Sequence, residues 1–412
     1  MPAESPLVPV DEHLKRILDS IDTLPAYDQP LLEVMGLPIA EDIMAPLPLP
    51  AFDNSGMDGY AVVHHDVASA SEQRPVHLPV VGEIAAGAAT IMAMSPGTAV
   101  RIMTGAPVPQ GCDAIVPVEW TDGGTSAVVI VQAPEVGQHI RRAGEDVAVG
   151  DRLVSEGDLI GPRQIGLLAS VGTSRVASRP RPRVVVISTG DELREPGEKL
   201  GSDSIYDGNS YMLAAAARAA GAIAYRVGIV RDDHEGFAEA LSDQLVRADV
   251  VVTSGGVSKG AYDVVKEVLQ EQGTVRFDEV AMQPGKPQGF GFVGEDSTPI
   301  FTLPGNPVSS YVSFEQFVLP AVRRMMGRAP YLRPEADALL TEAIRSPEGR
   351  RQFARGRLSV VDGRLAVTPV GAQGSHLIGD LAESDALVVV PESVTWVEAG
   401  ETVTVLPLDE DF

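Results

Sequence analysis

Acidic residues or glycines stand in three short segments that each follow an apolar, strand-like run. These segments are residues 188–192, 231–233 and 254–258, and Asp263 opens the helix-like run after the last one. Paired glycines let a backbone approach an anion closely, and the amides at the start of a following helix point toward that anion. Ser254, Gly255, Gly256 and Ser258 are therefore predicted to bind a phosphate.

Carboxylates stand in the same segments, where they would repel an anion unless a hard cation lay between them. Mg²⁺ is typically held by one or two carboxylates together with substrate phosphates. We therefore expect Mg²⁺, or another divalent cation, at Glu192, Asp232 and Asp263. Each acid alone is also typical of a helix N-cap or first turn, so only the group indicates a metal.

These segments need a scaffold that brings them together, and residues 181–329 predict one. Strand-like runs at 184–187, 224–230, 249–253 and 299–303 alternate with helix-like runs at 210–220, 235–247, 262–271 and 308–326. The alternation predicts a doubly wound, three-layer α/β domain, whose ligands bind beyond the carboxyl ends of the strands. Pro304 and Pro307 bracket a further strand end, and Pro307 suits the first position of a helix.

The sequence on either side of residues 181–329 lacks this regular alternation of strand-like and helix-like runs. Helical spacing of Leu14, Ile17 and Ile21 predicts a first helix. A second helix is predicted over residues 32–44 and a third over residues 162–170. Short β-prone runs fill 51–150 and dominate again after 330. We expect a multidomain α/β protein with a discontinuous helical N-terminal domain (1–47 plus 148–180) whose helices pack together, a β-rich insert (48–147), the central domain (181–329) and a C-terminal β-barrel-like domain (330–412).

Composition excludes several classes of function. The net charge of −25 repels nucleic acid and anionic membranes, so any anionic ligand needs local cations such as Arg141 or Lys286. Cys112 is the single cysteine, which rules out an intrachain disulfide. No signal peptide and no apolar run long enough to span a membrane is visible, so we expect a cytoplasmic protein.

Two motif matches suggest other chemistry. Residues 289–294 fit the dinucleotide fingerprint G-x-G-x-x-G, but they look like a strand and no helix follows. Residues 256–260 fit the G-x-S-x-G elbow of serine hydrolases, with Ser258 as nucleophile and His376 downstream. Two glycines separate Ser258 from the strand end, and no acid is paired with His376, so the hydrolase reading stays an alternative.

An ordered set of motifs through nearly the whole chain resembles the molybdopterin molybdenumtransferase (MoeA) family, which is related to the E domain of gephyrin. Each motif alone is weakly specific, whereas the set in this order is strongly so. The matching segments are residues 48–61, 100–106, 140–146, 188–193, 254–258, 284–287, 304–309 and 374–376.

The resemblance implies insertion of molybdate into the dithiolene of adenylylated molybdopterin, with release of AMP and dependence on a divalent metal. It implies an elongated homodimer in which Asp58 acts on the partner's site, and contacts with other cofactor-biosynthesis proteins or molybdoenzymes. Glu192, Asp232 and Asp263 would handle metal or protons, and residues 254–258 the nucleotide phosphates. The other site residues that it implies are Asp58, Thr104, Arg141, Asp146, Lys286, Pro304, Pro307, Arg355 and Ser375.

The chain departs from the family pattern near the expected oxyanion pocket. Gln283 stands where a lysine is frequent, Glu279 replaces a second basic residue, and Ala261 stands where an aspartate is common. Molybdate or tungstate therefore remain alternatives. Two other functions stay open, a molybdopterin adenylyltransferase, whose fold resembles residues 181–329, and a non-catalytic gephyrin-like scaffold.

Overall fold

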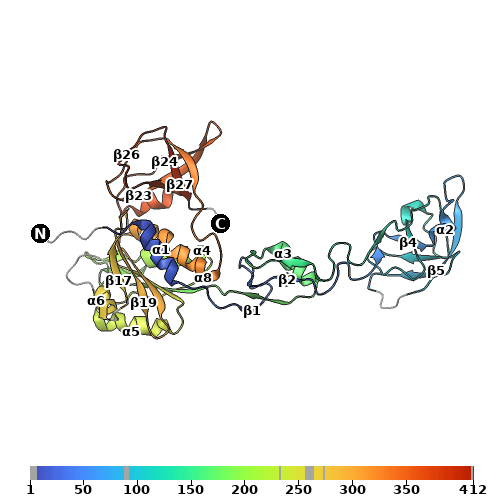
Figure 1. The fold of residues 1–412 in the computed structure, drawn as a ribbon, viewed down its shortest axis with the longest axis horizontal. Helices are drawn as coiled ribbons and strands as arrows, with labels where there is room; N and C mark the ends of the chain where they lie inside the picture. Colours follow the sequence, from blue (N-terminus) through green and yellow to red (C-terminus); the bar gives the residue numbers. More distant parts are fainter. Residues whose placement is uncertain (1–6, 88–91, 232, 256–263, 272–273, 410–411) are drawn as a thin grey trace. The chain divides into compact units, whose positions relative to one another are not determined.

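The computed structural model describes residues 7–87, 92–231, 233–255, 264–271, 274–409 and 412 (Figure 1). These residues form two compact units. Unit 1 comprises 1–28, 36–40 and 177–412, and unit 2 comprises 29–35 and 41–176. The chain passes from one unit to the other within β1 (Tyr27–Pro30) and β11 (Arg175–Ser178), and also between residues 35 and 36 and between residues 40 and 41.

Unit 1 is built on a six-stranded sheet of order β15-β12-β16-β20-β19-β17. The first four strands are parallel, whereas β19 and β17 run antiparallel at one edge. The predicted parallel sheet is therefore confirmed and extended by an antiparallel edge. The strands are β12 (Arg183–Ser188), β15 (Ile223–Arg226), β16 (Val250–Ser254), β17 (Arg276–Glu279), β19 (Pro287–Val293) and β20 (Thr298–Leu303).

Helices cover both faces of this sheet, because its central strands are apolar on both sides. Val184 and Val186 point into one core and Val185 and Ile187 into the other. Figure 1 shows α5 and α6 on one side of the strands and α1, α4 and α8 on the other. The helices are α1 (Val10–Ser20), α4 (Asn209–Ala219), α5 (His234–Leu245), α6 (Val264–Glu271), α7 (Pro307–Ser313) and α8 (Leu319–Met326).

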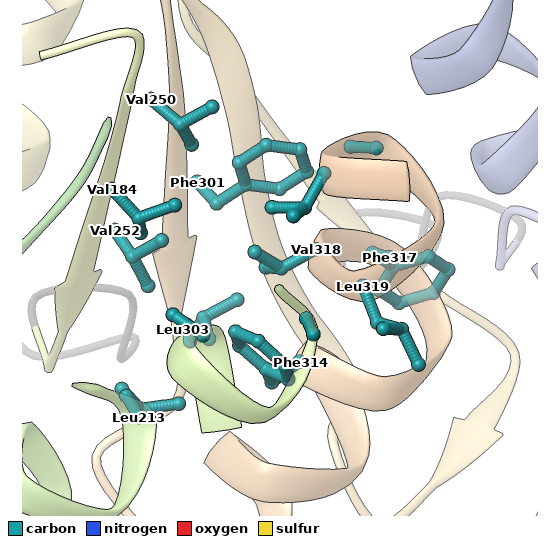
Figure 2. Packing of buried hydrophobic residues seen from close by; sticks show 14 of the residues in the cluster. Val184, Leu213, Val250, Val252, Phe301, Leu303, Phe314, Phe317, Val318 and Leu319 are labelled. Atoms are coloured by element: carbon teal, nitrogen blue, oxygen red, sulfur yellow. The ribbon is translucent and has the colours of Figure 1, made fainter. Parts of the chain in front are cut away.

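The larger core lies between the sheet and the segment 307–326. Phe301 and Leu303 of β20 meet Phe314 and Val318 there, as Figure 2 shows. The predicted single helix over 308–326 is interrupted by the π-helical segment η2 (Phe314–Val318) between α7 and α8. Burying side chains of this size is the main stabilising contribution to the α/β unit.

The C-terminal part of unit 1 is a closed β-barrel, as predicted. The hydrogen-bonded order β23-β24-β21-β27-β25 closes through an additional pairing of β23 with β25, and β18 adds to β23. The elements are β18 (Met282–Gln283), β21 (Ala336–Leu340), β22 (Ile344–Arg345), β23 (Arg351–Val361), β24 (Arg364–Pro369), α9 (Ile378–Glu383), β25 (Ala386–Val390), β26 (Trp396–Val397) and β27 (Thr402–Pro407). The short strands β13 (Leu193–Arg194) and β14 (Ile205–Tyr206) pair outside the main sheet.

Unit 2 contains the β-rich insert and one well-formed helix. Its five-stranded sheet has the order β7-β4-β6-β5-β8 around the buried Tyr60 and Val116. Smaller pairings join β3 to β9 and β2 to β10. The elements are β2 (Ile43–Met44), β3 (Asn54–Ser55), β4 (Gly59–Val62), α2 (His64–Val67), β5 (Val76–Ile84), β6 (Ala99–Ile102), β7 (Ala114–Pro117), η1 (Val118–Trp120), β8 (Ala127–Ile130), β9 (Ile140–Arg141), β10 (Arg152–Val154) and α3 (Pro162–Ser170).

The predicted second helix over 32–44 is wrong. Residues 31–36 form turns, and Gly36 adopts a φ of +76° that ends any helix there. Leu32 and Met35 are exposed, so the apolar residues of this stretch do not share one buried face.

The first helix forms as predicted but has other partners. We expected α1 to pack with the helix over 162–170, whereas α1 packs against α8 and η2 of unit 1. No described helix is long and apolar enough to cross a membrane. The four-domain division remains a prediction.

Candidate active site

The carboxyl ends of β12, β16 and β20 meet at one edge of the sheet. Ser188 is in register with Ser254, and Ser254 with Leu303. The Gly255 amide donates to the Leu303 carbonyl oxygen at 3.0 Å. A Cβ on Gly305 would lie 3.7 Å from the Gly255 Cα, so two of the glycine loops touch.

Gly255 itself has a φ of +96°, which a residue with a side chain rarely adopts. A Cβ there would lie 3.6 Å from the Thr189 carbonyl oxygen, so the loop after β12 lies alongside it. Ser254, Gly255 and residues 304–307 are thus brought together. Gly256, Ser258, Asp232 and Asp263 lie outside the described residues, so their predicted roles stay predictions.

A polar segment outside the predicted site residues holds these strand ends. Asp207 is 1% exposed, accepts from the Ser188 hydroxyl at 3.2 Å, and accepts from the Ser210 amide and hydroxyl at 3.1 and 2.5 Å. Arg226 lies 3.8 Å from its carboxylate. The Asn209 amide nitrogen donates to the Ser254 hydroxyl at 2.8 Å and to the Gly305 carbonyl at 2.7 Å.

Asn209 therefore joins the loops after β16 and β20, and Asp207 secures the end of β12. A signal for both was present in the sequence. Asp and Asn just before a helix-like run are typical capping residues. Asp207 does accept from Ser210 at the start of α4. Only the fold shows that Asp207 also reaches Ser188 and that Asn209 reaches Ser254 and Gly305.

Asn209→Asp should slow turnover by about ten- to a hundredfold, because an isosteric carboxylate cannot donate to Gly305 and shifts the loop by a fraction of an ångström. The melting temperature should change little, since Asn209 is only half-buried. Steady-state kinetics with thermal unfolding checks this. Gln270→Glu, the same chemical change at an exposed position, should be neutral, and equal rates for both variants would contradict the role of Asn209.

Glu192 is the one predicted metal ligand within the described residues. Its side chain is exposed and folds back over Gly190, where a Cβ would lie 2.5 Å from its carboxylate. Gly190 has a φ of +153°, which favours a glycine at this position. Among the residues that the structure describes, no group of three acidic, histidine or cysteine side chains is placed to hold a metal.

The barrel contributes Arg355 and Ser375. Arg355 is 1% exposed, and its guanidinium donates to the Gly374 carbonyl at 3.0 Å and to the Ala372 carbonyl. The Ser375 carbonyl accepts from the Val308 amide at 3.1 Å, in the first turn of the helix that Pro307 opens. Burial lowers the pKa of Arg355. Its guanidinium thus positions residues 372–375 against the sheet edge.

The segment that carries Lys286 has little free positive charge. Lys286 lies 2.9 Å from Glu279, one of the residues that depart from the family pattern. Another of them, Gln283, accepts a 3.3 Å hydrogen bond from Arg350. Gly285 has a φ of +100°, and a Cβ there would lie 2.9 Å from the Ser313 hydroxyl, so the bend is tightly enclosed. An anion at this bend must compete with Glu279 for Lys286.

Unit 2 holds Asp58, Thr104, Arg141 and Asp146. Asp58 accepts from the Thr104 amide at 2.7 Å and from its hydroxyl at 2.8 Å. Arg141 pairs with Asn54 across β3 and β9, and a Cβ on Gly56 would lie 3.7 Å from the Arg141 Nε. Asp146 is exposed, and its amide donates to Leu49. The structure thus joins Asp58 to Thr104, two residues that the sequence analysis selected separately.

Thr104→Val should raise the pKa of Asp58. In the native protein the amide and then the hydroxyl of Thr104 lower this pKa. The ionised Asp58 carboxylate therefore stabilises the folded state at pH values above its unfolded-state pKa, and this stabilisation is lost as the pH falls through its native-state pKa. Without the hydroxyl, Asp58 should titrate at higher pH. Carboxyl ¹³C NMR measures this, and Asp122, whose pKa is lowered by the amides of Val129 and Gly124, serves as internal control. An unchanged Asp58 titration would contradict the prediction.

The rival motifs receive no support from described residues. Residues 289–293 lie in strand β19, as predicted, and not in a loop that opens a helix. His376 is exposed, and Ser258 lies outside the described residues. Burial raises the pKa of the Cys112 thiol to about 11, so it is not a nucleophile at neutral pH.

Glycine loops and a bridging amide at the carboxyl edge of a parallel sheet define an α/β protein with a candidate ligand site at that edge, here extended by a closed barrel. Family models match most of the chain: "MoeA N-terminal region (domain I and II)" over 8–172, "Probable molybdopterin binding domain" over 185–324, and "MoeA C-terminal region (domain IV)" over 337–408. The chain belongs to the MoeA family.

Relatives match it over nearly their full length. Molybdopterin molybdenumtransferase 2 of Mycobacterium tuberculosis is 46% identical over 97% of this chain and 99% of its own. The molybdopterin molybdenumtransferase of Haemophilus influenzae is 38% identical over 90% of this chain and 91% of its own. The crystal structure of a molybdopterin biosynthesis MoeA protein from Pyrococcus horikosii is 32% identical, has a TM-score of 0.82, and covers 98% of this chain and 100% of its own.

Proposed function

We propose that this chain inserts molybdate into the dithiolene of adenylylated molybdopterin and releases AMP, in a reaction that depends on a divalent metal. Membership of the MoeA family makes it a transferase of molybdenum cofactor biosynthesis. The observation that carries the finer proposal is the convergence of Ser254, Gly255 and Gly305 at one sheet edge, tied together by Asn209.

The described loops suit the nucleotide part of this substrate. Backbone at Gly255 and Gly305 is open to close approach by a pyrophosphate. Mg²⁺ is a substrate-bridging cation, and oxygen ligands such as the Glu192 carboxylate, with Asp232 and Asp263, are the type it prefers. When bound, it would offset the negative charge of phosphates and molybdate.

Proton handling is the second requirement. Molybdate that gains two sulfur ligands sheds oxo groups as water, which needs positioned proton donors and acceptors. Asp58 is held by the amide and hydroxyl of Thr104, which lower its pKa, so its ionised carboxylate is positioned to accept hydrogen bonds from groups that carry these protons. Arg355 and Ser375 place residues 372–375 beside the start of α7, where an oxyanion would meet the nucleotide.

Turnover of adenylylated molybdopterin tests the proposal. AMP should appear only with molybdate and Mg²⁺, stop on addition of EDTA, and fall at least about a hundredfold in Asp263→Ala. Asp243→Ala, an exposed carboxylate change on α5, should be neutral. No AMP release from the wild-type protein would contradict the proposal, and consumption of ATP instead would identify an adenylyltransferase. Competing tungstate with molybdate measures the oxyanion preference.

We further propose a cytoplasmic homodimer in which Asp58 completes the partner's site. Mixing and reassembling two inactive variants, Asp58→Asn and Asp263→Ala, should restore about a quarter of wild-type AMP release. The fraction follows because half of the dimers are mixed and each of these has one intact site. No recovery after verified subunit exchange would place Asp58 in the site of its own chain.

A further inference from the structure

A hollow of about 1200 Å³ lies on the barrel, and the proposed reaction gives it no role. One wall is the two-stranded ribbon of β22 and β26, where Arg345 stands opposite Trp396 and the Ser346 amide donates to Thr395. The opposite wall includes Pro369 and residues 371–373. The second wall leads directly to Gly374 and Ser375, which contact Arg355 and the start of α7.

Two buried polar groups that line this hollow lack partners. Gln352 is 2% exposed and Ser346 is 4% exposed. The Gln352 Oε1 and Ser346 Oγ atoms have no hydrogen-bond partner among the described residues. Buried polar atoms are nearly always paired, so a ligand or ordered water is expected to reach them. Because an amide oxygen only accepts, a ligand that satisfies Gln352 must present an N–H or O–H donor.

The charge of the residues that line the hollow favours a neutral ligand over an anionic one. Glu342 and Glu348 line it together with the single cation Arg345, so its lining is net negative. A phosphate or an oxyanion would be repelled, whereas a neutral group rich in donors would be favoured. Trp396 is 52% exposed and offers a flat indole face, and Ile344 and Pro347 add apolar surface. Such an exposed aromatic suits a flat ring.

We propose that this hollow binds the pterin ring of the substrate, stacked on Trp396. The inference rests on the proposed function, whose substrate contains two flat, donor-rich ring systems, a pterin and an adenine. A pterin carries an amino group beside a ring N–H, and this pair of donors matches a glutamate carboxylate or the Gln352 oxygen. The pterin would then lie beyond residues 371–375, and its phosphates would reach the strand-end loops.

Binding of free pterin, with neither phosphate nor dithiolene, isolates the ring. The chain has two tryptophans, so an ¹⁵N–¹H spectrum contains two indole signals. Pterin should shift the Trp396 signal and leave that of Trp120, which lies in unit 2, unchanged. Adenosine should shift neither. A shift of Trp396 by adenosine and not by pterin would assign the hollow to the nucleotide base and overturn the proposal.

Calorimetric titration of variants locates the contacts. Trp396→Ala and Gln352→Met should each weaken pterin binding at least about tenfold, while Trp396→Phe, which keeps a stacking face, should stay within about threefold of wild type. Tyr27→Ala, at an aromatic of similar exposure, should have no effect. Circular dichroism would identify any variant that fails to fold. Equal affinity for pterin in wild type and Trp396→Ala would overturn the proposal.

The two proposals fail separately. If AMP release is observed but pterin leaves the Trp396 signal unchanged, the ring site is wrong and the transferase reaction stands. If pterin binds at Trp396 and no AMP is released, the ring site stands and the reaction is wrong.

Discussion

Gly59→Ala is expected to unfold the β-rich sheet of unit 2. A Cβ on Gly59 would lie 2.0 Å from the Val116 carbonyl oxygen and 2.9 Å from its carbonyl carbon. Both atoms belong to the backbone of β7, which is hydrogen-bonded to β4, so neither can move without breaking the pairing. Overpacking against side chains costs about 1–3 kcal/mol, and a backbone clash of this size should cost at least the upper value.

Gly59→Ala should also affect activity, because Gly59 is adjacent to Asp58 in the sequence. Gly59 begins the strand that follows Asp58, and the Asp58 carbonyl accepts from the Val118 amide at 3.0 Å. Loss of the β4–β7 pairing should release Asp58 from Thr104 and abolish turnover. Unit 1 should stay folded, because its cores are built from its own residues.

Urea unfolding monitored by Trp120 fluorescence in a Trp396→Phe background measures the effect on unit 2 alone. Gly166→Ala is the matched control in the same unit. It lies within α3, nothing would contact its Cβ within 4 Å, and alanine favours a helix by up to about 1 kcal/mol. We expect this control to be neutral or stabilising. A Gly59→Ala protein with the unfolding midpoint of wild type would refute the prediction.

Asp207→Ala should destabilise unit 1 by about 3–5 kcal/mol. The substitution leaves the Ser188 and Ser210 hydroxyls and the Ser210 amide without their acceptor, all in a buried environment. It also leaves Arg226 without one of its two carboxylate neighbours. Removing one member of a buried charged network typically has a cost of this order.

Turnover should fall in the same variant, because Ser188 ends the strand whose loop carries Glu192. Asp207→Asn preserves the volume and part of the hydrogen bonding, so its effect on both measurements should be smaller. Asp203→Ala, at an exposed position four residues earlier, should be neutral. Urea unfolding followed by Trp396 fluorescence, in a Trp120→Phe background, would separate these outcomes. If Asp207→Ala were as stable as Asp203→Ala, the carboxylate would not hold the strand ends.

The sequence was most informative where one local pattern has one structural solution. The apolar run at 184–187 predicted a strand buried on both faces, which β12 confirms, and the helix predicted over 162–170 has the observed bounds of α3. It was least informative at 32–44, where apolar spacing suggested a helix and a positive φ at Gly36 decided otherwise.

For the active site, the sequence by itself determined the types of group and the loops that carry them. The sequence alone identified the glycines at 255 and 305, the carboxylate of Glu192 and the ordered motifs of the MoeA family. Only the tertiary structure decided which groups meet, because contacts such as Asn209 to Ser254 and Gly305 join residues far apart in the chain. It also decided that Lys286 is neutralised by Glu279 and that Arg355 is engaged by backbone carbonyls. Charge pairing and burial depend on three-dimensional neighbours, and local sequence patterns do not encode those.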